Sequence, residues 1–206
     1  MTTLITGGAG YIGSITARAI RASGRGVVVL DTLENGHRKA VGDAPFVQGD
    51  VADADIVRRT VEEHEVDEVV HFAAYKAVGE SMENPGKYFA NNVTGSQKLF
   101  EALHSAGVNR VVFSSTAAVY GTPARVPVRE TDSTDCESVY AETKLMMNSK
   151  AVPHKRSCVE RRTNYYLGFV FGILILVAGV STLVSVGKTY AEPTVNGRSE
   201  EHTSEL

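Results

Sequence analysis

The chain has 206 residues, of which 43% are apolar and 22% charged, and its formal net charge is −3. This length allows one domain, or one domain with an appendage, and the composition excludes wholesale disorder. The near-neutral charge argues against nucleic acid as the main partner. The histidines form no H-x-x-x-H pair, so we predict no metal site. The two distant cysteines, Cys136 and Cys158, favour a reduced, cytoplasmic setting. Because the N-terminus enters a strand pattern at once, we expect no signal peptide.

Short apolar runs alternate with amphipathic stretches through the first two thirds of the chain. The predicted strands are Thr3–Thr6, Val27–Asp31, Phe46–Gln48, Glu68–Phe72 and Arg110–Ser114. The run VVVLD is continuously apolar and β-branched, as is typical of a strand buried on both faces. One predicted helix has its buried face at Phe89, Val93, Ser96, Phe100 and Leu103. This alternation predicts a doubly wound α/β fold around a parallel sheet.

The first strand runs into a glycine loop, LITGGAGYIGS, which places Gly7, Gly10 and Gly13 in a G-x-x-G-x-x-G pattern. One glycine permits a tight turn, one lets the backbone approach a pyrophosphate, and one lets the helix pack closely. The following helix offers free N–H groups and the positive end of its dipole. The strand–loop–helix context therefore predicts a dinucleotide site.

Asp31 stands at the end of the second strand, 18 residues past Gly13. A carboxylate at this spacing accepts hydrogen bonds from the adenosine ribose hydroxyls and repels a 2′-phosphate. Asp31 therefore predicts NAD rather than NADP. The alternative is an ordinary solvated carboxylate at a strand end.

Two further motifs bring polar groups to the sheet. VYAETK places Tyr140 and Lys144 on one helix face, where an ammonium is expected to lower the pKa of a phenol and make it a usable base. FSSTAAVYG follows a strand, at the edge where ligands bind in parallel sheets. We interpret Ser114 and Ser115 as structural and Thr116 as functional.

Seven motifs occur in order between Met1 and about Met147: TGGAGYIGS, VVLDTLENG, QGDVAD, HFAAYKAVGES, YFANNVTGS, FSSTAAVYG and YAETK. Together they resemble the extended short-chain dehydrogenase/reductase family and, within it, the UDP-glucose 4-epimerase branch. The neighbouring 4,6-dehydratases carry Thr-Asp-Glu where this chain has Thr116-Ala117-Ala118. Without that acid, dehydration is not expected.

The resemblance implies an NAD-binding Rossmann domain over residues 1–149. It implies roles for Asp50 and Val51 at the adenine, for Asn35 in assisting Asp31, and for Asn91 beside the cofactor pocket. It also implies that Phe72, Ala73 and Lys76 line the pyrophosphate and ribose. The full implied cofactor set is Gly7, Gly10, Tyr11, Ile12, Gly13, Asp31, Asn35, Asp50, Val51, Phe72, Ala73, Lys76, Asn91, Tyr140 and Lys144, and the implied catalytic trio is Thr116, Tyr140 and Lys144.

The implied reaction is the interconversion of UDP-glucose and UDP-galactose through a 4-keto sugar, with NAD regenerated in every turnover. Two alternatives remain open. One is a 4-epimerase acting on another nucleotide sugar, and the other is an NAD-binding module without catalysis.

The family pattern stops near Ser149. Residues 150–197 hold a basic linker and an uncharged stretch at 166–187, which is long enough to cross a bilayer. Residues 198–206, RSEEHTSEL, resemble the translation of a sequencing adapter, which favours foreign sequence over a true membrane anchor. No substrate-binding lobe is recognisable, so we expect a truncated or chimeric, inactive epimerase. The sequence leaves the oligomeric state open, a homodimer included.

Overall fold

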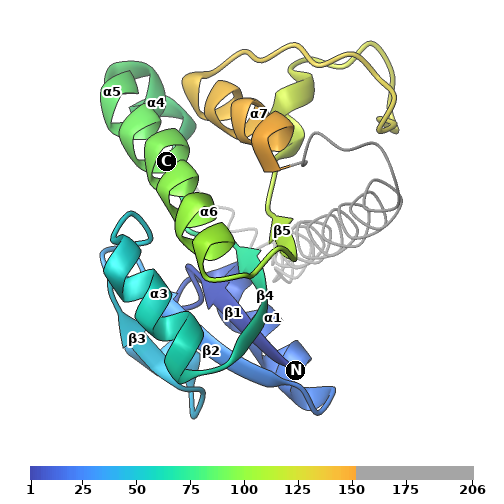
Figure 1. Cartoon of the computed structure of the whole chain (residues 1–206). Helices are drawn as coiled ribbons and strands as arrows, with labels where there is room; N and C mark the ends of the chain where they lie inside the picture. Colours follow the sequence, from blue (N-terminus) through green and yellow to red (C-terminus); the bar gives the residue numbers. More distant parts are fainter. Residues whose placement is uncertain (152–206) are drawn as a thin grey trace, which may run out of the picture. The chain divides into compact units, whose positions relative to one another are not determined.

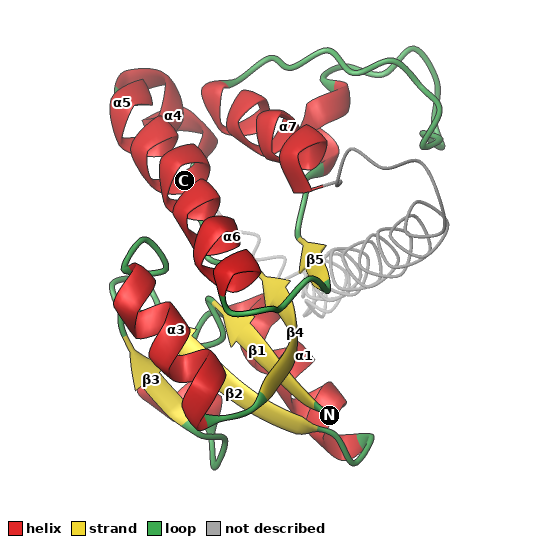
Figure 2. Cartoon of the chain, in the orientation of Figure 1, coloured by secondary structure: helices red, strands yellow, loops and turns green. Residues whose placement is uncertain are grey.

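The computed structural model describes residues 1–151, in which five parallel strands form one sheet with helices on both faces (Figures 1 and 2). The strands are β1 (Thr2–Thr6), β2 (Gly26–Asp31), β3 (Phe46–Gln48), β4 (Val66–His71) and β5 (Val111–Phe113), in the order β3-β2-β1-β4-β5. The helices are α1 (Tyr11–Ala22), α2 (Arg38–Val41), α3 (Ala54–Glu63), α4 (Val78–Glu83), α5 (Pro85–Tyr88), α6 (Ser96–Ser105) and α7 (Val139–Ala151). A π-helix, η1 (Phe89–Gly95), precedes α6, and a 3₁₀-helix, η2 (Ala117–Tyr120), follows β5. The predicted doubly wound α/β fold is confirmed.

The central strands are buried on both faces, as their continuous apolar runs predict. In β1, Leu4 packs in a cluster with Val57 of α3 and Leu99 of α6. The next residue, Ile5, packs in a separate cluster with Ala17 of α1. Figure 1 shows α3 and α6 in front of the sheet and α1 behind it. Successive side chains of one strand therefore build two cores.

All five predicted strands are present, with ends that differ by up to two residues. The largest shift is in β4, which runs from Val66 to His71 because its first residue already pairs with Thr2 of β1. The fifth strand is shorter than predicted, since its pairing with β4 covers only Val111–Phe113. Strand ends are set by the partner strand, which periodicity does not reveal.

The predicted helical face from Phe89 to Leu103 is present, but the segment is not one continuous α-helix. Its first seven residues form η1, a π-helix, and α6 begins at Ser96. A π-turn widens the helix and changes which side chains share a face. Asn92 and Leu99 are also buried, although the predicted spacing omits them.

The segments proposed for 150–197 and 198–206 lie outside the described residues, except for Lys150 and Ala151 at the end of α7. The apolar stretch 166–187 and Cys158 are among the residues that are not described. Within residues 1–151, no helix has the length and hydropathy to cross a membrane. The same part of the chain holds no cluster of His, Cys, Asp or Glu side chains that could bind a metal ion.

Candidate functional site

Gly7, in the loop between β1 and α1, and Gly13, in the first turn of α1, lie too close to other backbone to carry side chains. Gly7 has a φ of 71°, and a Cβ there would lie 2.6 Å from the nitrogen of Ala73. A Cβ on Gly13 would collide with the carbonyl oxygen of Gly7. The Gly10 N–H donates to that same oxygen at 3.2 Å. Glycine therefore lets the loop lie against both α1 and the loop that follows β4.

The first turn of α1 can receive an anion. Its N-cap, Gly10, provides no side-chain hydrogen bond, and the first turn contains no acidic residue. Tyr11 is exposed and Ile12 is half-buried in this turn. Uncapped N–H groups and the positive end of the helix dipole favour a phosphate here.

Asp31 at the end of β2 holds the glycine loop in shape. Its Oδ2 accepts the N–H of Ala9 at 3.0 Å, and its Oδ1 accepts the N–H of Leu33 at 2.8 Å. A carboxylate has about four acceptor positions, so two bonds leave capacity for ribose hydroxyls. Asn35 is exposed in the same loop. Asp31 is thus half-buried and bonded rather than freely solvated.

The residues assigned to the adenine lie just after β3. Asp50 is exposed, and its Oδ1 accepts the N–H of Ala52 at 2.8 Å. Val51 packs in the core cluster between the sheet and α3, with only 7% of its surface exposed. Asp50 is therefore the more accessible of the two.

The residues assigned to the pyrophosphate and ribose follow β4. The Phe72 N–H donates to the carbonyl oxygen of Thr6 at 3.0 Å, which continues the β1–β4 pairing. The backbone of Ala73 is what a Cβ on Gly7 would meet first, and Lys76 is exposed further along the loop. The predicted cofactor segments after β1, β2, β3 and β4 therefore meet at one edge of the sheet, as parallel strands require.

Asn92, which the sequence analysis missed, joins this loop to α7. Its Oδ1 accepts the N–H of Tyr75 at 2.9 Å, and its Nδ2 donates to the carbonyl oxygen of Tyr75 at 2.9 Å. The same Nδ2 donates to Oγ1 of Thr143 at 3.2 Å. Asn91 is half-buried, and its Nδ2 donates to Oδ1 of Asn92 at 2.9 Å. Two consecutive amides in an otherwise apolar helical pattern were the available signal.

Tyr140 lies in the first turn of α7 and is held by its backbone. Its N–H donates to Oγ of Ser81, which is buried in α4, at 3.1 Å. Thr116 caps η2, since its Oγ1 accepts the N–H of Ala118 at 3.2 Å. Burial raises the pKa of Tyr140, and a hydrogen bond with the Thr116 side chain acts in the opposite direction. The structure thus brings these two predicted hydroxyls together.

Lys144 lies one helical turn further along α7 and is buried. Its Nζ donates to the carbonyl oxygen of Ser114 at 2.9 Å and lies 4.7 Å from the ring centroid of Phe113. Burial lowers the pKa of Lys144 to about 8. Its ammonium has three donors, so two remain beyond the bond to Ser114.

The prediction that Lys144 lowers the pKa of Tyr140 is wrong for this structure. The pKa of Tyr140 is raised, because burial disfavours the phenolate, and the opposing interaction comes from Thr116.

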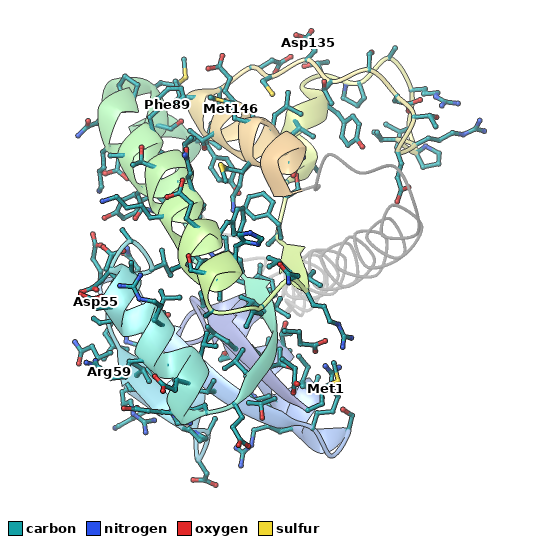
Figure 3. All side chains as sticks on the ribbon, in the orientation of Figure 1. Met1, Asp55, Arg59, Phe89, Asp135 and Met146 are labelled. Atoms are coloured by element: carbon teal, nitrogen blue, oxygen red, sulfur yellow. The ribbon has the colours of Figure 1, made fainter. Side chains whose placement is uncertain are left out.

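The structural interpretation of Ser115 fits its contact, since its Oγ accepts a hydrogen bond from Nδ2 of Asn148 in α7 at 2.9 Å. Figure 3 labels Phe89 of η1 and Met146 of α7, the two elements that pack together here.

His71, at the end of β4, is a second buried polar residue that the sequence analysis missed. Its Nδ1 lies 2.6 Å from Oγ1 of Thr6, and its Nε2 lies 2.8 Å from Oγ of Ser96. Burial and, to a smaller extent, the charge of Lys144 lower the pKa of His71 to about 3. A neutral histidine therefore links β1, β4 and α6 beneath the candidate site.

Comparison with known proteins adds to this geometry. The model of the NAD dependent epimerase/dehydratase family matches residues 3–181. The chain belongs to this family. The UDP-glucose 4-epimerase of Lacticaseibacillus casei is 49% identical over 148 residues, which cover 71% of this chain and 45% of that protein. The enzyme of the same name from Lactobacillus helveticus is 41% identical over 196 residues, covering 94% and 57%.

Solved structures of this epimerase family agree in fold. The UDP-glucose 4-epimerase of Brucella ovis in complex with NAD aligns with a TM-score of 0.71 and 41% identity, over 72% of this chain and 46% of that one. The Bifidobacterium longum enzyme, in complex with NAD⁺ and UDP, gives 0.70 and 32%, over 73% and 48%. The chain thus spans about half the length of the relatives it matches.

Proposed function

We propose that this chain carries the NAD-binding and proton-transferring part of a UDP-glucose 4-epimerase. The observation that supports this most is the placement of Thr116, Tyr140 and Lys144 at the sheet edge that also bears the glycine loop. The relatives that match over the same residues are UDP-glucose 4-epimerases.

The residues present fit a dinucleotide, because Gly7 and Gly13 let the loop pack closely against Ala73 and α1, and α1 begins without a side-chain cap. In the proposal, the glycine loop and the first turn of α1 hold the pyrophosphate. Asp31 and Asn35 bind the adenosine ribose, and Asp50 lies at the adenine. The other assigned contacts come from Val51, Phe72, Ala73, Lys76 and Asn91. NAD held by these residues would supply a reversible hydride acceptor for the sugar C4.

Tyr140 is the proposed base. Its phenolic oxygen takes the proton of the sugar 4-hydroxyl and later returns it, while Thr116 holds the reacting oxygen. Burial raises the pKa of Tyr140, and the hydrogen bond with Thr116 acts in the opposite direction and favours the phenolate. Lys144, with a pKa of about 8, is mostly protonated at neutral pH and has donors left for the nicotinamide ribose.

A UDP-sugar is the proposed substrate. The Stenotrophomonas maltophilia relative was solved with NAD and formylated UDP-arabinopyranose, and it aligns with 43% identity. Interconversion of UDP-glucose and UDP-galactose is the preferred assignment. Another nucleotide sugar remains the alternative substrate, and a non-catalytic NAD module the alternative class.

A chimera tests the proposal. Residues 1–148 of this chain replace the matching part of the L. casei enzyme, and conversion of UDP-galactose is measured with and without Tyr140→Phe. We expect turnover from the chimera, none from its Tyr140→Phe variant, and NAD binding by both. NAD binding without turnover in the chimera would favour the non-catalytic module. The chain of residues 1–206 alone is expected to show no turnover, because nothing positions the sugar.

A cytoplasmic location is part of the proposal, with anchoring through residues 166–187 as the alternative. Carbonate extraction of membranes separates the two. Release of the chain into the supernatant is expected, and retention in the pellet would favour the anchor.

A further inference from the structure

A hydrogen bond joins the two loops on either side of the glycine loop. The hydroxyl of Tyr75 donates to Oε2 of Glu34 at 2.8 Å. Glu34 lies in the loop after β2, and Tyr75 lies in the loop after β4. Since β1 lies between β2 and β4 in the sheet, the bond spans the end of the strand from which the glycine loop begins.

Both loops also contact the glycine loop directly. After β2, the His37 N–H donates to the carbonyl oxygen of Ala9 at 2.9 Å. After β4, the nitrogen of Ala73 would lie 2.6 Å from a Cβ on Gly7. The Tyr75–Glu34 bond therefore completes a ring of contacts around the glycine loop, at the edge where ligands of such sheets bind.

Tyr75 is fixed independently of Glu34. Asn92 bonds both the N–H and the carbonyl oxygen of Tyr75. Nζ of Lys87 lies 4.3 Å from the centroid of its ring, and the ring of Tyr88 lies 5.7 Å away. A phenol held in this way loses little further freedom when its hydroxyl meets Glu34, so even a solvent-accessible bond can contribute.

We propose that the Tyr75–Glu34 hydrogen bond is a latch that slows the release of a dinucleotide bound on the glycine loop. The inference rests on the proposed function, in which NAD is regenerated in every turnover and does not have to dissociate between turnovers. At neutral pH the hydroxyl of Tyr75 keeps its proton and can donate a hydrogen bond to Glu34. The bond to Glu34, followed by burial, raises the pKa of Tyr75 to about 12, so its hydroxyl remains a donor.

The test measures the release of NADH from the full chain. Bound NADH is chased with excess NAD, and its fluorescence is followed by stopped flow for the wild type, Tyr75→Phe, Glu34→Ala and the double variant. Tyr75→Phe keeps the ring and its contacts with Lys87 and Tyr88. Each single variant is expected to release NADH about 3- to 10-fold faster, the range for one lost hydrogen bond. The double variant is expected to be no faster than the faster single one.

Glu83→Ala is the matched control, since Glu83 is an exposed glutamate at the end of α4. Its release rate is expected to stay within about 2-fold of the wild type, the effect of a surface change. Unchanged release in both single variants, or multiplicative effects in the double variant, would overturn the latch and leave the proposed function standing. Slower release from Glu34→Ala would also overturn it, because charge repulsion of the diphosphate would then dominate. A folded wild type that binds no NADH would overturn both proposals.

Discussion

The two halves of the candidate site are stabilised by different kinds of contact. The half formed by β1, β2 and the glycine loop is held mainly by close contacts between backbone groups. These contacts require that Gly7 and Gly13 carry no side chain. The half formed by β4, η1 and α7 is held by buried polar side chains, among them His71, Asn92 and Lys144. The first half is therefore sensitive to added volume, and the second is sensitive to a lost hydrogen-bond partner.

The largest expected effect lies in the glycine half. Gly7→Ala forces a Cβ against the backbone of Ala73 at a φ of 71°, so it is expected to lower the free energy of unfolding by about 3 kcal/mol. Gly24→Ala is the matched control, because Gly24 has a φ of 83° but nothing within 4 Å of a Cβ. Its cost is expected to be about 1 kcal/mol. Equal losses in urea unfolding would show that close approach to Ala73 is unimportant.

A substitution in the half formed by β4, η1 and α7 is expected to lower the free energy of unfolding somewhat less. Asn92→Ala leaves the N–H and carbonyl of Tyr75 without the bonds that Asn92 provides, and it is expected to cost about 2 kcal/mol. Asn109→Ala changes the same residue type at an exposed position and is expected to cost about 0.5 kcal/mol or less. The comparison uses urea unfolding of both variants. A loss at Asn109 as large as that at Asn92 would contradict the assignment.

A third effect depends on pH. The folded-state pKa of His71 is about 3, below the unfolded value near 6.5, so the unfolded chain takes up the proton first on acidification. The stabilising contribution of neutral His71 is complete above pH 6.5 and is lost as the pH falls toward 3. One proton corresponds to about 1.4 kcal/mol per pH unit, so roughly 1–2 kcal/mol should be lost between pH 6.5 and 5.

The measurement is the slope of the unfolding free energy against pH. His71→Gln, which keeps hydrogen-bonding groups at the site, is expected to flatten this slope. His104→Gln, at an exposed histidine, is expected to preserve it. Identical slopes in the wild type and His71→Gln would mean that another group carries the pH dependence.

The sequence was most informative where the structure is local. The spacing of Gly7, Gly10 and Gly13 and the position of Asp31 lie within one strand–helix–strand unit, and the five strands follow from short apolar runs. Such features need only neighbouring residues to specify them. The same holds for Tyr140 and Lys144, which share a helix.

The contacts that join distant segments were not predictable in this way. Asn92 reaches Thr143 across 51 residues, and Tyr75 reaches Glu34 across 41. The π-turn at η1, which places Asn92, has no signature in apolar periodicity. The burial of Lys144, and with it the pKa that lies below the usual lysine value, depends on packing against Phe113. Tertiary context sets each of these features.

The most direct test of the central claim is a calorimetric titration of the purified chain with NAD and, separately, with NADP. We expect one NAD to bind per chain, with an affinity at least about 10-fold above that for NADP, because the Asp31 carboxylate repels a 2′-phosphate. A folded sample that binds neither dinucleotide, or that binds NADP as tightly as NAD, would contradict the assignment of the glycine loop and Asp31.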